Sequence, residues 1–460
     1  MWCCRQRALL LLLLVFLKLL PTATCLCPTN CSFRFYPPDV TIYEYQKYPG
    51  FVEISCGLFE NSTDYADFAN FQLQSSDSVV LRIDNVTSAS SIYGDVIANF
   101  SIFGNRVGRA NVGVALPNGN CPVESKLEVA VLRNSNNYEI SFTIVIAIFI
   151  AVTNFFMGSQ IRLDVLWSHI RKPVGPALGV FCQFVVMPLV SLGLCYTFLT
   201  ESDYIKLGLF AVGTSPAGAQ SNFWTVLLDG NIDLSVALTV TSTVAALGFL
   251  PLWLLTVGQE VVARNTKIRI PFVNIVAGLA LLIIPLSAGI VVGRRKPTWR
   301  AAIAKIIKIT SLTFAAFIAI AGSLLKQYIF SLFTLRRVLS GLLLPWAGFG
   351  IAYLLSCLLR FPSADVRTVA IETGIQNAGL AVVIIDTALA HPDSDIVIVM
   401  PTICLMFTFI PFMFIFAFYR LKLWICAKWA KKKSLDPVLT GDSKVETVAV
   451  QPREAVSLLT

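Results

Sequence analysis

Histidine is nearly absent from this chain of 460 residues, which contains only two. His169 and His391 both stand at the ends of apolar segments, where solvated or hydrogen-bonded histidines are common. The sequence also has no His, Cys and carboxylate group at metal-ligand spacing, no glycine-rich phosphate loop and no Ser/His/Asp set. The serine of "TSPAGAQS" lacks the strand-to-helix setting of a nucleophile elbow. These absences predict that the protein is not an enzyme and has no cofactor.

Charged residues are scarce at 14%, and the net charge of +9 comes largely from short basic clusters. Examples are "RKP" (171–173), "GRRKPTWR" (293–300) and "KWAKKK" (428–433). No stretch interleaves basic and aromatic residues in a way that suits nucleic-acid bases, so nucleic acid is not an expected partner. Basic clusters in short loops are instead typical of the cytoplasmic loops of a membrane protein.

Long apolar runs are the most abundant feature, because 56% of the residues are hydrophobic and the mean hydropathy is +0.72. From residue 140 onward, stretches of about 20 apolar residues recur, and each is long enough to cross a bilayer as a helix. The lipid bilayer is therefore the expected environment. We predict nine spans, near 140–160, 173–199, 204–228, 233–257, 270–293, 301–328, 337–360, 366–390 and 395–425.

The loops between these spans predict an orientation. The basic "RLDVLWSHIRKP" and "GRRKPTWR" fall on one side, and the acidic "TESD" (200–203) and "HPDSD" (391–395) fall on the other. Two loops, "DGNID" (229–233) and "ARNTKIR" (263–269), oppose the pattern. Because positive loops favour the cytoplasm, we expect an extracellular N-terminal region and a cytoplasmic tail at 428–460, in the plasma membrane.

The first 25 residues have a basic start, a short leucine-rich run and then small residues. This order is typical of a cleaved secretory signal. A short membrane anchor is the alternative, although the apolar run is too short to span a bilayer comfortably.

Residues 26–138 differ from the rest, because apolar and polar residues alternate there between Gly, Pro and Asn turns. Alternation with a period of two predicts a small β-sandwich. Asn-X-Ser/Thr sequons are confined to this region, which supports an extracellular, glycosylated domain. The predicted glycosylation sites are Asn30, Asn61, Asn85 and Asn99.

The cysteines of this region are expected to form two disulfide bonds in an oxidising compartment. Four cysteines allow three pairings, and the sequence does not choose among them. The candidates are Cys27, Cys31, Cys56 and Cys121.

Two of the predicted spans, within the membrane region 139–427, contain residues that interrupt helices. The third span has Pro216 and Gly218 in "TSPAGAQSNFW", and the eighth has Gly374 and Asn377 in "ETGIQN". Proline removes a backbone donor and glycine loosens a helix, so both spans are expected to break at mid-membrane. Two interrupted spans at comparable places predict a transporter of the inverted-repeat type, with its site where the breaks meet. A kink that serves helix packing is the alternative for either break alone.

The polar residues in these spans are predicted to be ion ligands. Glu372 and Gln376 are four residues apart and share a face wherever the segment is helical, and Ser235 and Thr239 have the same spacing. An ionised glutamate at the bilayer centre costs at least about 2.5–3.5 kcal/mol unless it is compensated. No lysine or arginine stands at the same depth, so a bound cation is the expected counter-charge. Protonated Glu372 in a proton relay remains the alternative.

At this point the sequence resembles the sodium/bile acid cotransporter family over residues 140–425. The glycosylated N-terminal domain is similar to that of the family's orphan branch with long extracellular segments. The segments that carry the resemblance, in order, are "FMGSQIRLDVLWSHIRKPVG" (156–175), "CQFVVMPL" (182–189), "SPAGAQSN" (215–222), "LDGNIDLSVALTVTSTVAALGFLPLW" (228–253) and "ETGIQN" (372–377).

The resemblance implies two sodium sites. Glu372 is common to both, and backbone carbonyls around Thr373 and Ile375 complete the second. The sequence departs from the family pattern at Ala217, where a glycine is usual, and at Asp386, where a neutral polar residue is usual; the simplest reading of Asp386 is that it reaches the outer interface. The side chains at matching positions are Ser221, Asn222, Ser235, Thr239 and Glu372 for the first site, and Gln183, Glu372 and Gln376 for the second.

These observations together predict a sodium-coupled importer of an organic anion such as a bile salt or a steroid sulfate. The alternative is an extracellular receptor, or an orphan carrier whose transporter-like body does not carry bile acids.

Overall fold

The computed structural model describes residues 31–440, except for 57–71, 91–95, 116–125, 134–137 and the positions 172, 265, 267, 323, 325 and 326. Several predictions lie outside the described residues: the signal peptide, the sequons at Asn30 and Asn61, and the cysteines Cys27 and Cys121.

The N-terminal region forms two four-stranded sheets, in the orders β1-β3-β6-β5 and β2-β8-β7-β4. Apolar residues alternate along each strand, as in β8, where Leu127, Val129 and Val131 are buried. Side chains from both sheets form one hydrophobic cluster, which supports the predicted β-sandwich. The strands are β1 (Cys31–Tyr36), β2 (Asp39–Tyr43), β3 (Lys47–Cys56), β4 (Gln72–Ser75), β5 (Leu81–Ser90), β6 (Val96–Gly104), β7 (Gly108–Ala115) and β8 (Leu127–Leu132).

The strand register bears on two predictions. Antiparallel pairing of β1 and β3 places the backbone of Cys31 directly opposite that of Cys56. Neighbours across an antiparallel pair lie within the Cα separation that a disulfide bond spans, so the backbone is compatible with this pairing. On β6, Asn99 is exposed between the buried Ala98 and Phe100, so its side chain is open to a glycan. Disulfide bonding and glycosylation both remain predictions.

The rest of the described chain is helical. Six helical stretches are long and apolar enough to cross a membrane, which confirms a multi-pass membrane protein. They are Ser141–Gln160, Val174–Phe198, Ile232–Glu260, Phe272–Arg295, Leu335–Leu358 and Asp393–Lys422. The helices within and beside them are α3 (Tyr138–Gln160), α4 (Leu163–Arg171), α5 (Val174–Phe181), α6 (Met187–Phe198), α9 (Ile232–Trp253), α10 (Phe272–Arg295), α14 (Leu335–Leu358), α17 (Asp393–Val397), α18 (Val399–Phe407) and α19 (Phe409–Thr440).

Two of the other three predicted spans are divided, and the third is described only in part. The span at 204–228 consists of α7 (Asp203–Gly213) and α8 (Ser221–Leu227), and the span at 366–390 consists of α15 (Ser363–Gly374) and α16 (Ala378–Ala388). The span at 301–328 consists of α11 (Arg300–Phe317), a π-helical turn η4 (Ile318–Gly322) and α13 (Gln327–Ser331). The two expected helix interruptions are therefore present, while the total of nine spans remains a prediction.

Small residues bring α3 and α10 into backbone contact. A Cβ atom added to Gly289 or Gly293 of α10 would lie 2.0 or 2.1 Å from a carbonyl oxygen of α3. A Cβ atom added to Gly158 of α3 would likewise lie 2.2 Å from Leu286 O of α10. Glycines at such positions allow close helix packing in lipid, where burial of apolar surface does not drive association.

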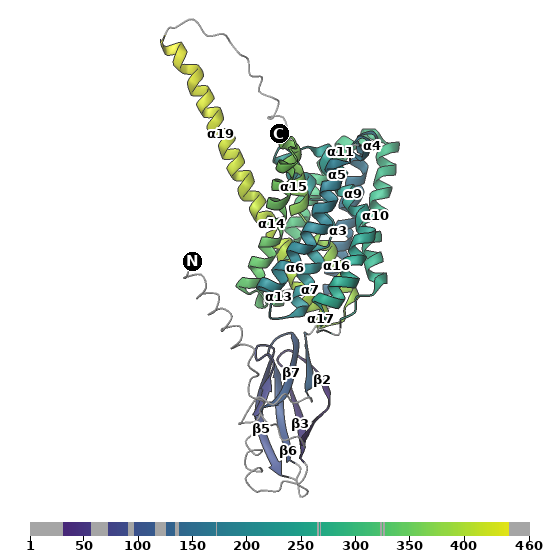
Figure 1. Ribbon diagram of the computed structural model, residues 1–460, viewed down its shortest axis with the longest axis vertical. Coiled ribbons are helices and arrows are strands. Elements are labelled where there is room, and N and C mark those ends of the chain that lie inside the picture. Colours follow the sequence, from purple (N-terminus) through teal and green to yellow (C-terminus); the bar gives the residue numbers. More distant parts are fainter. Residues whose placement is uncertain are drawn as a thin grey trace, which may run out of the picture.

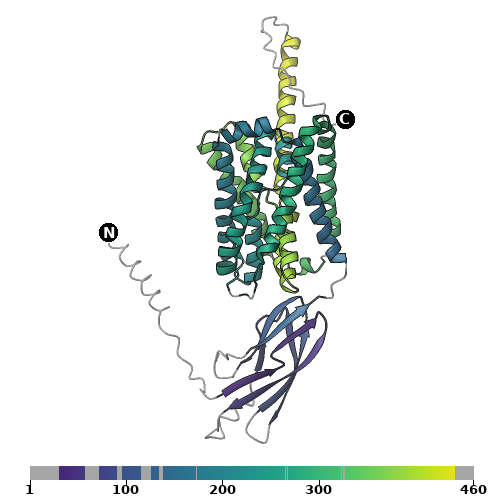
Figure 2. The ribbon, with the colours of Figure 1, turned by 90° about the vertical axis from the view of Figure 1, so that its right-hand side faces the viewer.

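The sheets lie against one end of the helical bundle, next to α13 and α17 (Figure 1). α19 projects beyond the opposite end of the bundle (Figure 2). Both broken helices lie inside the bundle, since nearly all of α16 and the second half of α15 are buried.

Candidate functional site

Two helix interruptions face each other in the middle of the bundle. α7 ends at Gly213 and α8 begins at Ser221, while α15 ends at Gly374 and α16 begins at Ala378. Pro216 and Gly218 lie inside the first break, and Asn377 caps α16 by accepting a hydrogen bond from Leu380 N at 3.1 Å. All four predicted break residues therefore lie in a break or at its edge.

The backbone groups that each break releases are satisfied by the other break. Gly218 N donates to Ile375 O at 2.8 Å, and Asn377 N donates to Pro216 O at 2.9 Å. Ala217 and Gln376 form an antiparallel bridge between the two chain segments. Broken helices are stable at membrane depth when their polar backbone groups find such partners. The crossing also explains Gly218, because a Cβ atom there would lie 3.1 Å from Gln376 O.

Glu372 lies on α15 beside this crossing and is only 3% exposed. Ser235 Oγ donates a hydrogen bond to Glu372 Oε2 at 3.0 Å, and Thr239 Oγ1 donates to Oε1. Ser235 and Thr239 are one turn apart on α9, so both hydroxyl groups reach the carboxylate from one helix face. Asn222 Nδ2 lies 3.4 Å from Thr239 Oγ1 and joins α8 to the same group. The structure thus brings together the five residues expected at the first ion site.

Among the described residues, two buried oxygen atoms in the first turn of α8, Ser221 Oγ and Asn222 Oδ1, form no hydrogen bond of normal geometry, although Ser221 is close enough to Glu372 to interact with its carboxylate. Buried polar atoms are normally satisfied, because leaving one unsatisfied costs about 1–3 kcal/mol. Hydroxyl, amide and carboxylate oxygens are the ligands that hard cations prefer. These residues therefore fit a cation that would use the two oxygens together with Glu372.

The residues expected at the second site form a separate cluster. Gln183 lies on a π-helical turn, η1 (Cys182–Val186), and its Nε2 donates to Gln376 Oε1 at 2.6 Å and to Ser215 O at 2.7 Å. Gln376 Nε2 in turn donates to Thr373 O at 2.9 Å. α15 ends at Gly374, so Gln376 follows the helix and does not share its face with Glu372. Within the described residues, the side-chain hydrogen bonds of Glu372 go to α9 and none joins it to Gln183 or Gln376.

Sequence reasoning missed two neighbours of these clusters. Thr225 Oγ1 lies 3.2 Å from Ser235 Oγ, and Ser215 contributes the carbonyl that Gln183 contacts. Thr225 is four residues after Ser221 on α8, so helical spacing was the signal that could have identified it. Beside the crossing lies a small cavity with polar groups on its wall, among them Thr153, Asn154, Gln220 and Asn377.

Comparisons with known proteins agree with this geometry. A family described as "Sodium Bile acid symporter family" matches residues 147–333. The sodium-dependent organic anion transporter of Bos taurus is 33% identical over 273 residues, which cover 58% of this chain and 70% of that protein. The ileal sodium/bile acid cotransporter of Homo sapiens is 32% identical over 274 residues, which cover 59% of this chain and 77% of that protein. The human sodium-dependent organic anion transporter is 32% identical over 267 residues, covering 57% and 69%.

Proposed function

We propose, since the chain belongs to the Sodium Bile acid symporter family, that it is a sodium-coupled symporter of an organic anion. The proposed substrate is of the bile salt or steroid sulfate type, imported by alternating access. Relatives with transporter names confirm that the protein is not an enzyme. The observation that carries the sodium proposal is the buried carboxylate of Glu372 beside two buried oxygens that, within the described residues, form no hydrogen bond of normal geometry.

The first sodium ion would be held by the group around Glu372, which Ser221, Asn222, Ser235 and Thr239 complete. Sodium would replace the missing partners of the α8 oxygens and compensate the charge of Glu372 in a low-dielectric setting. The second ion would lie at Gln183 and Gln376, where amide oxygens and the carbonyls of the broken α15 converge.

Two ions beside one carboxylate leave a net positive charge, which favours an anionic substrate. A tenfold sodium gradient supplies about 1.4 kcal/mol per ion, and moving one charge through about 60 mV adds about 1.4 kcal/mol. One sodium ion with a monoanion is electroneutral and sustains only about tenfold accumulation. Two sodium ions supply about 4 kcal/mol and sustain about thousandfold accumulation.

The proposed architecture has nine spans with an inverted repeat, preceded by an extracellular β-sandwich at residues 26–138. The signal peptide would be residues 1–25, the transporter domain residues 139–427 and the cytoplasmic tail residues 428–460, in the plasma membrane. The sheets and the end of α19, at opposite ends of the bundle, support opposite sides for the two termini (Figure 2).

Uptake of labelled taurocholate and a labelled steroid sulfate, in sodium and in choline buffer, tests this function. We expect sodium-dependent uptake that rises with sodium more steeply than first order. Glu372→Gln should reduce it to the choline level, because the variant removes the charge that binds the ions.

Glu260→Gln is the matched control, since Glu260 is exposed at the end of the helical stretch Ile232–Glu260 and, in the part of the chain that the structure describes, pairs with Arg269 at 3.4 Å. It should leave uptake unchanged. If the wild-type protein reaches the cell surface and takes up neither compound, the importer proposal fails for these substrates. The receptor or orphan-carrier alternative would then replace it.

A further inference from the structure

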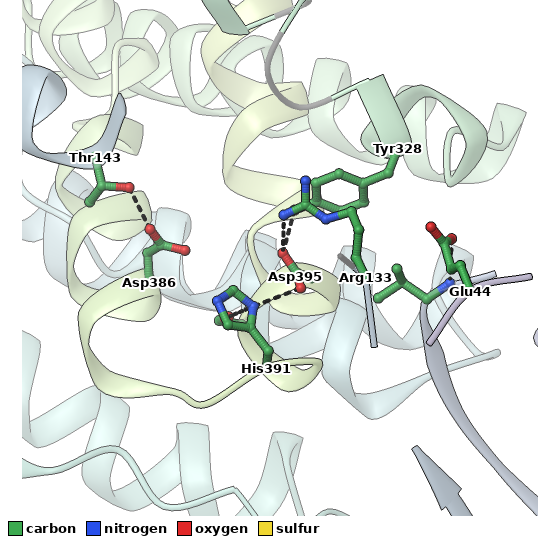
Figure 3. Close-up of polar contacts among 9 residues, drawn as sticks. Glu44, Arg133, Thr143, Tyr328, Asp386, His391 and Asp395 are labelled. Atoms are coloured by element: carbon green, nitrogen blue, oxygen red, sulfur yellow. Dashed lines mark hydrogen bonds and ion pairs between the residues drawn. The ribbon is translucent and has the colours of Figure 1, made fainter. Parts of the chain in front are cut away.

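The contact between the extracellular sheets and the helical bundle centres on Asp395. This carboxylate lies on α17, which follows the second broken helix, and only 1% of its side chain is exposed. Tyr328 of α13 donates its hydroxyl to Asp395 Oδ1 at 2.9 Å, and Arg133 Nη2 lies 3.3 Å from the same atom. His391 Nδ1 lies 2.7 Å from Oδ2. Figure 3 shows these three side chains converging on the carboxylate from three segments.

Arg133 reaches Asp395 from the end of β8, one residue after the strand. Its guanidinium also lies over the Tyr328 ring, with the central carbon 4.1 Å from the ring centroid, and 13% of its side chain is exposed. A guanidinium over a ring and against a buried carboxylate is a specific contact, because the arginine provides the opposite charge that water no longer screens.

A second ion pair strengthens the contact. Arg109 of β7 donates from Nε to Asp393 Oδ1 at 2.6 Å and from Nη2 to Oδ2 at 3.2 Å. This hydrogen bonding raises the pKa of the Arg109 guanidinium. Glu44 supports the loop before β7, because its carboxylate accepts a hydrogen bond from Val107 N at 2.9 Å (Figure 3). The pair of Arg109 and Asp393 is bidentate, the geometry in which arginine and carboxylate bind most strongly.

These contacts join two groups of helices. α3 packs against α10 and α11, whereas α14 packs against α6, α15 and α18. The sheets precede α3 and Tyr328 follows α11, so two partners of Asp395 belong with the first group. Asp393 and Asp395 lie on α17, which packs against α7, α16 and α18. Although α16 also contacts α3 and α10, α18 packs against α14, and this contact joins α17 to the second group. Alternating access requires one group to move against the other around a central site.

A counterpart exists at the opposite end, at Asp229 after α8. Tyr419 of α19 donates its hydroxyl to the Asp229 carboxylate, and Arg367 of α15 donates to Asp229 O at 2.6 Å. Each broken helix thus leads into an acidic segment that a tyrosine and an arginine hold. At Asp229 both partners come from the bundle, whereas at Asp395 the arginine comes from the sheets.

We propose that the extracellular domain is an intramolecular cap that Arg109 and Arg133 fasten to α17, and that must release for each transport cycle. The inference rests on the proposed transport function. The cap stabilises the conformation in which these contacts form, so weakening it shifts the balance of conformations and with it the apparent affinity for sodium.

Charge reversal at Arg109 and Asp393, whose side chains are 36% and 15% exposed, tests the contact without altering the buried Asp395. Arg109→Glu and Asp393→Arg should each increase hydrogen exchange in β7 and α17 and change the half-saturating sodium concentration of uptake about two- to fivefold, in the same direction. The double variant should restore both. Arg82→Glu is the control, since Arg82 pairs within the domain with Asp84 at 3.0 Å, and it should change neither quantity. Single variants without effect, or a double variant without restoration, would overturn the cap.

Cross-linking tests whether the extracellular domain must release from α17 during transport. Arg109→Cys with Asp393→Cys, bridged by a bis(methanethiosulfonate) reagent of arginine-like length that forms a disulfide bond with each cysteine, should lose uptake and regain it when a reductant cleaves those bonds. The two single-cysteine variants, treated alike, should keep uptake. Full uptake by the bridged protein would show that the cap does not release. Absence of uptake by the wild-type protein would instead refute the proposed function, and hydrogen exchange would still decide whether the contact exists.

Discussion

Glu372 combines the burial of a core leucine with the chemistry of a surface residue. Hydroxyl groups of Ser235 and Thr239 donate to it, and Asn222 Nδ2 lies 3.4 Å from Thr239 Oγ1. Hydrogen bonds to a charged group contribute about 1.5–3 kcal/mol each, which is comparable to the insertion cost of a charged residue. Two such bonds together supply about 3–6 kcal/mol, enough to offset an insertion cost of about 2.5–3.5 kcal/mol. What they leave uncompensated is the negative charge of Glu372, which a cation would balance.

Removing one hydroxyl from this group should weaken sodium binding and leave the fold intact. Ser235→Ala should raise the half-saturating sodium concentration of uptake about tenfold, as loss of one contact to a charged group predicts. Sodium titration of uptake measures the change. Ser242→Ala is the matched control, because Ser242 is equally buried on α9 but donates to Thr239 O at 3.0 Å. Equal shifts in both variants would contradict a specific role for Ser235.

The sequence predicted much of this group because helical spacing and the cost of a buried charge are local properties. Glu372, Ser235 and Thr239 could be identified as polar residues at one-turn spacing in apolar spans. Gln183 could be assigned only through the family resemblance, which the comparisons confirm at the level of the family. Its partner Gln376 lies 193 residues away, and no local pattern predicts that contact.

At the scale of elements, proline and glycine located the two helix breaks correctly. The sequence did not reveal that the breaks satisfy each other, because Gly218 and Ile375 meet only through the tertiary fold. It also did not reveal the π-helical turn that carries Gln183, since that turn lies in an uninterrupted apolar run.

Because α3 and α10 are in backbone contact, a single added methyl group between them is expected to lower the stability of the protein. Gly289→Ala would place a Cβ atom 2.0 Å from Phe155 O, so the helices must separate. We expect a loss of about 1–3 kcal/mol in stability, visible as a lower Tm in detergent. Gly248→Ala on α9 is the control, since no atom lies within 4 Å of the added Cβ. An unchanged Tm for Gly289→Ala would contradict the backbone contact.

At the scale of the whole molecule, the sequence predicted two regions of different character but not how they meet. Composition and alternation separated a strand-rich region from a helical one. The ion pair between Arg109 and Asp393 joins residues 284 positions apart, and the acidic "HPDSD" loop read only as an extracellular segment. Six helical stretches in the described residues confirmed a multi-pass membrane protein, while the total of nine crossings remains a prediction.

Binding of radiolabelled sodium to the purified full-length protein tests the central claim most directly, because it requires no knowledge of the substrate. The account predicts saturable binding by the wild-type protein and by Glu260→Gln, and its loss in Glu372→Gln. Sodium binding that persists undiminished in Glu372→Gln would contradict the proposal that the buried carboxylate is a sodium ligand.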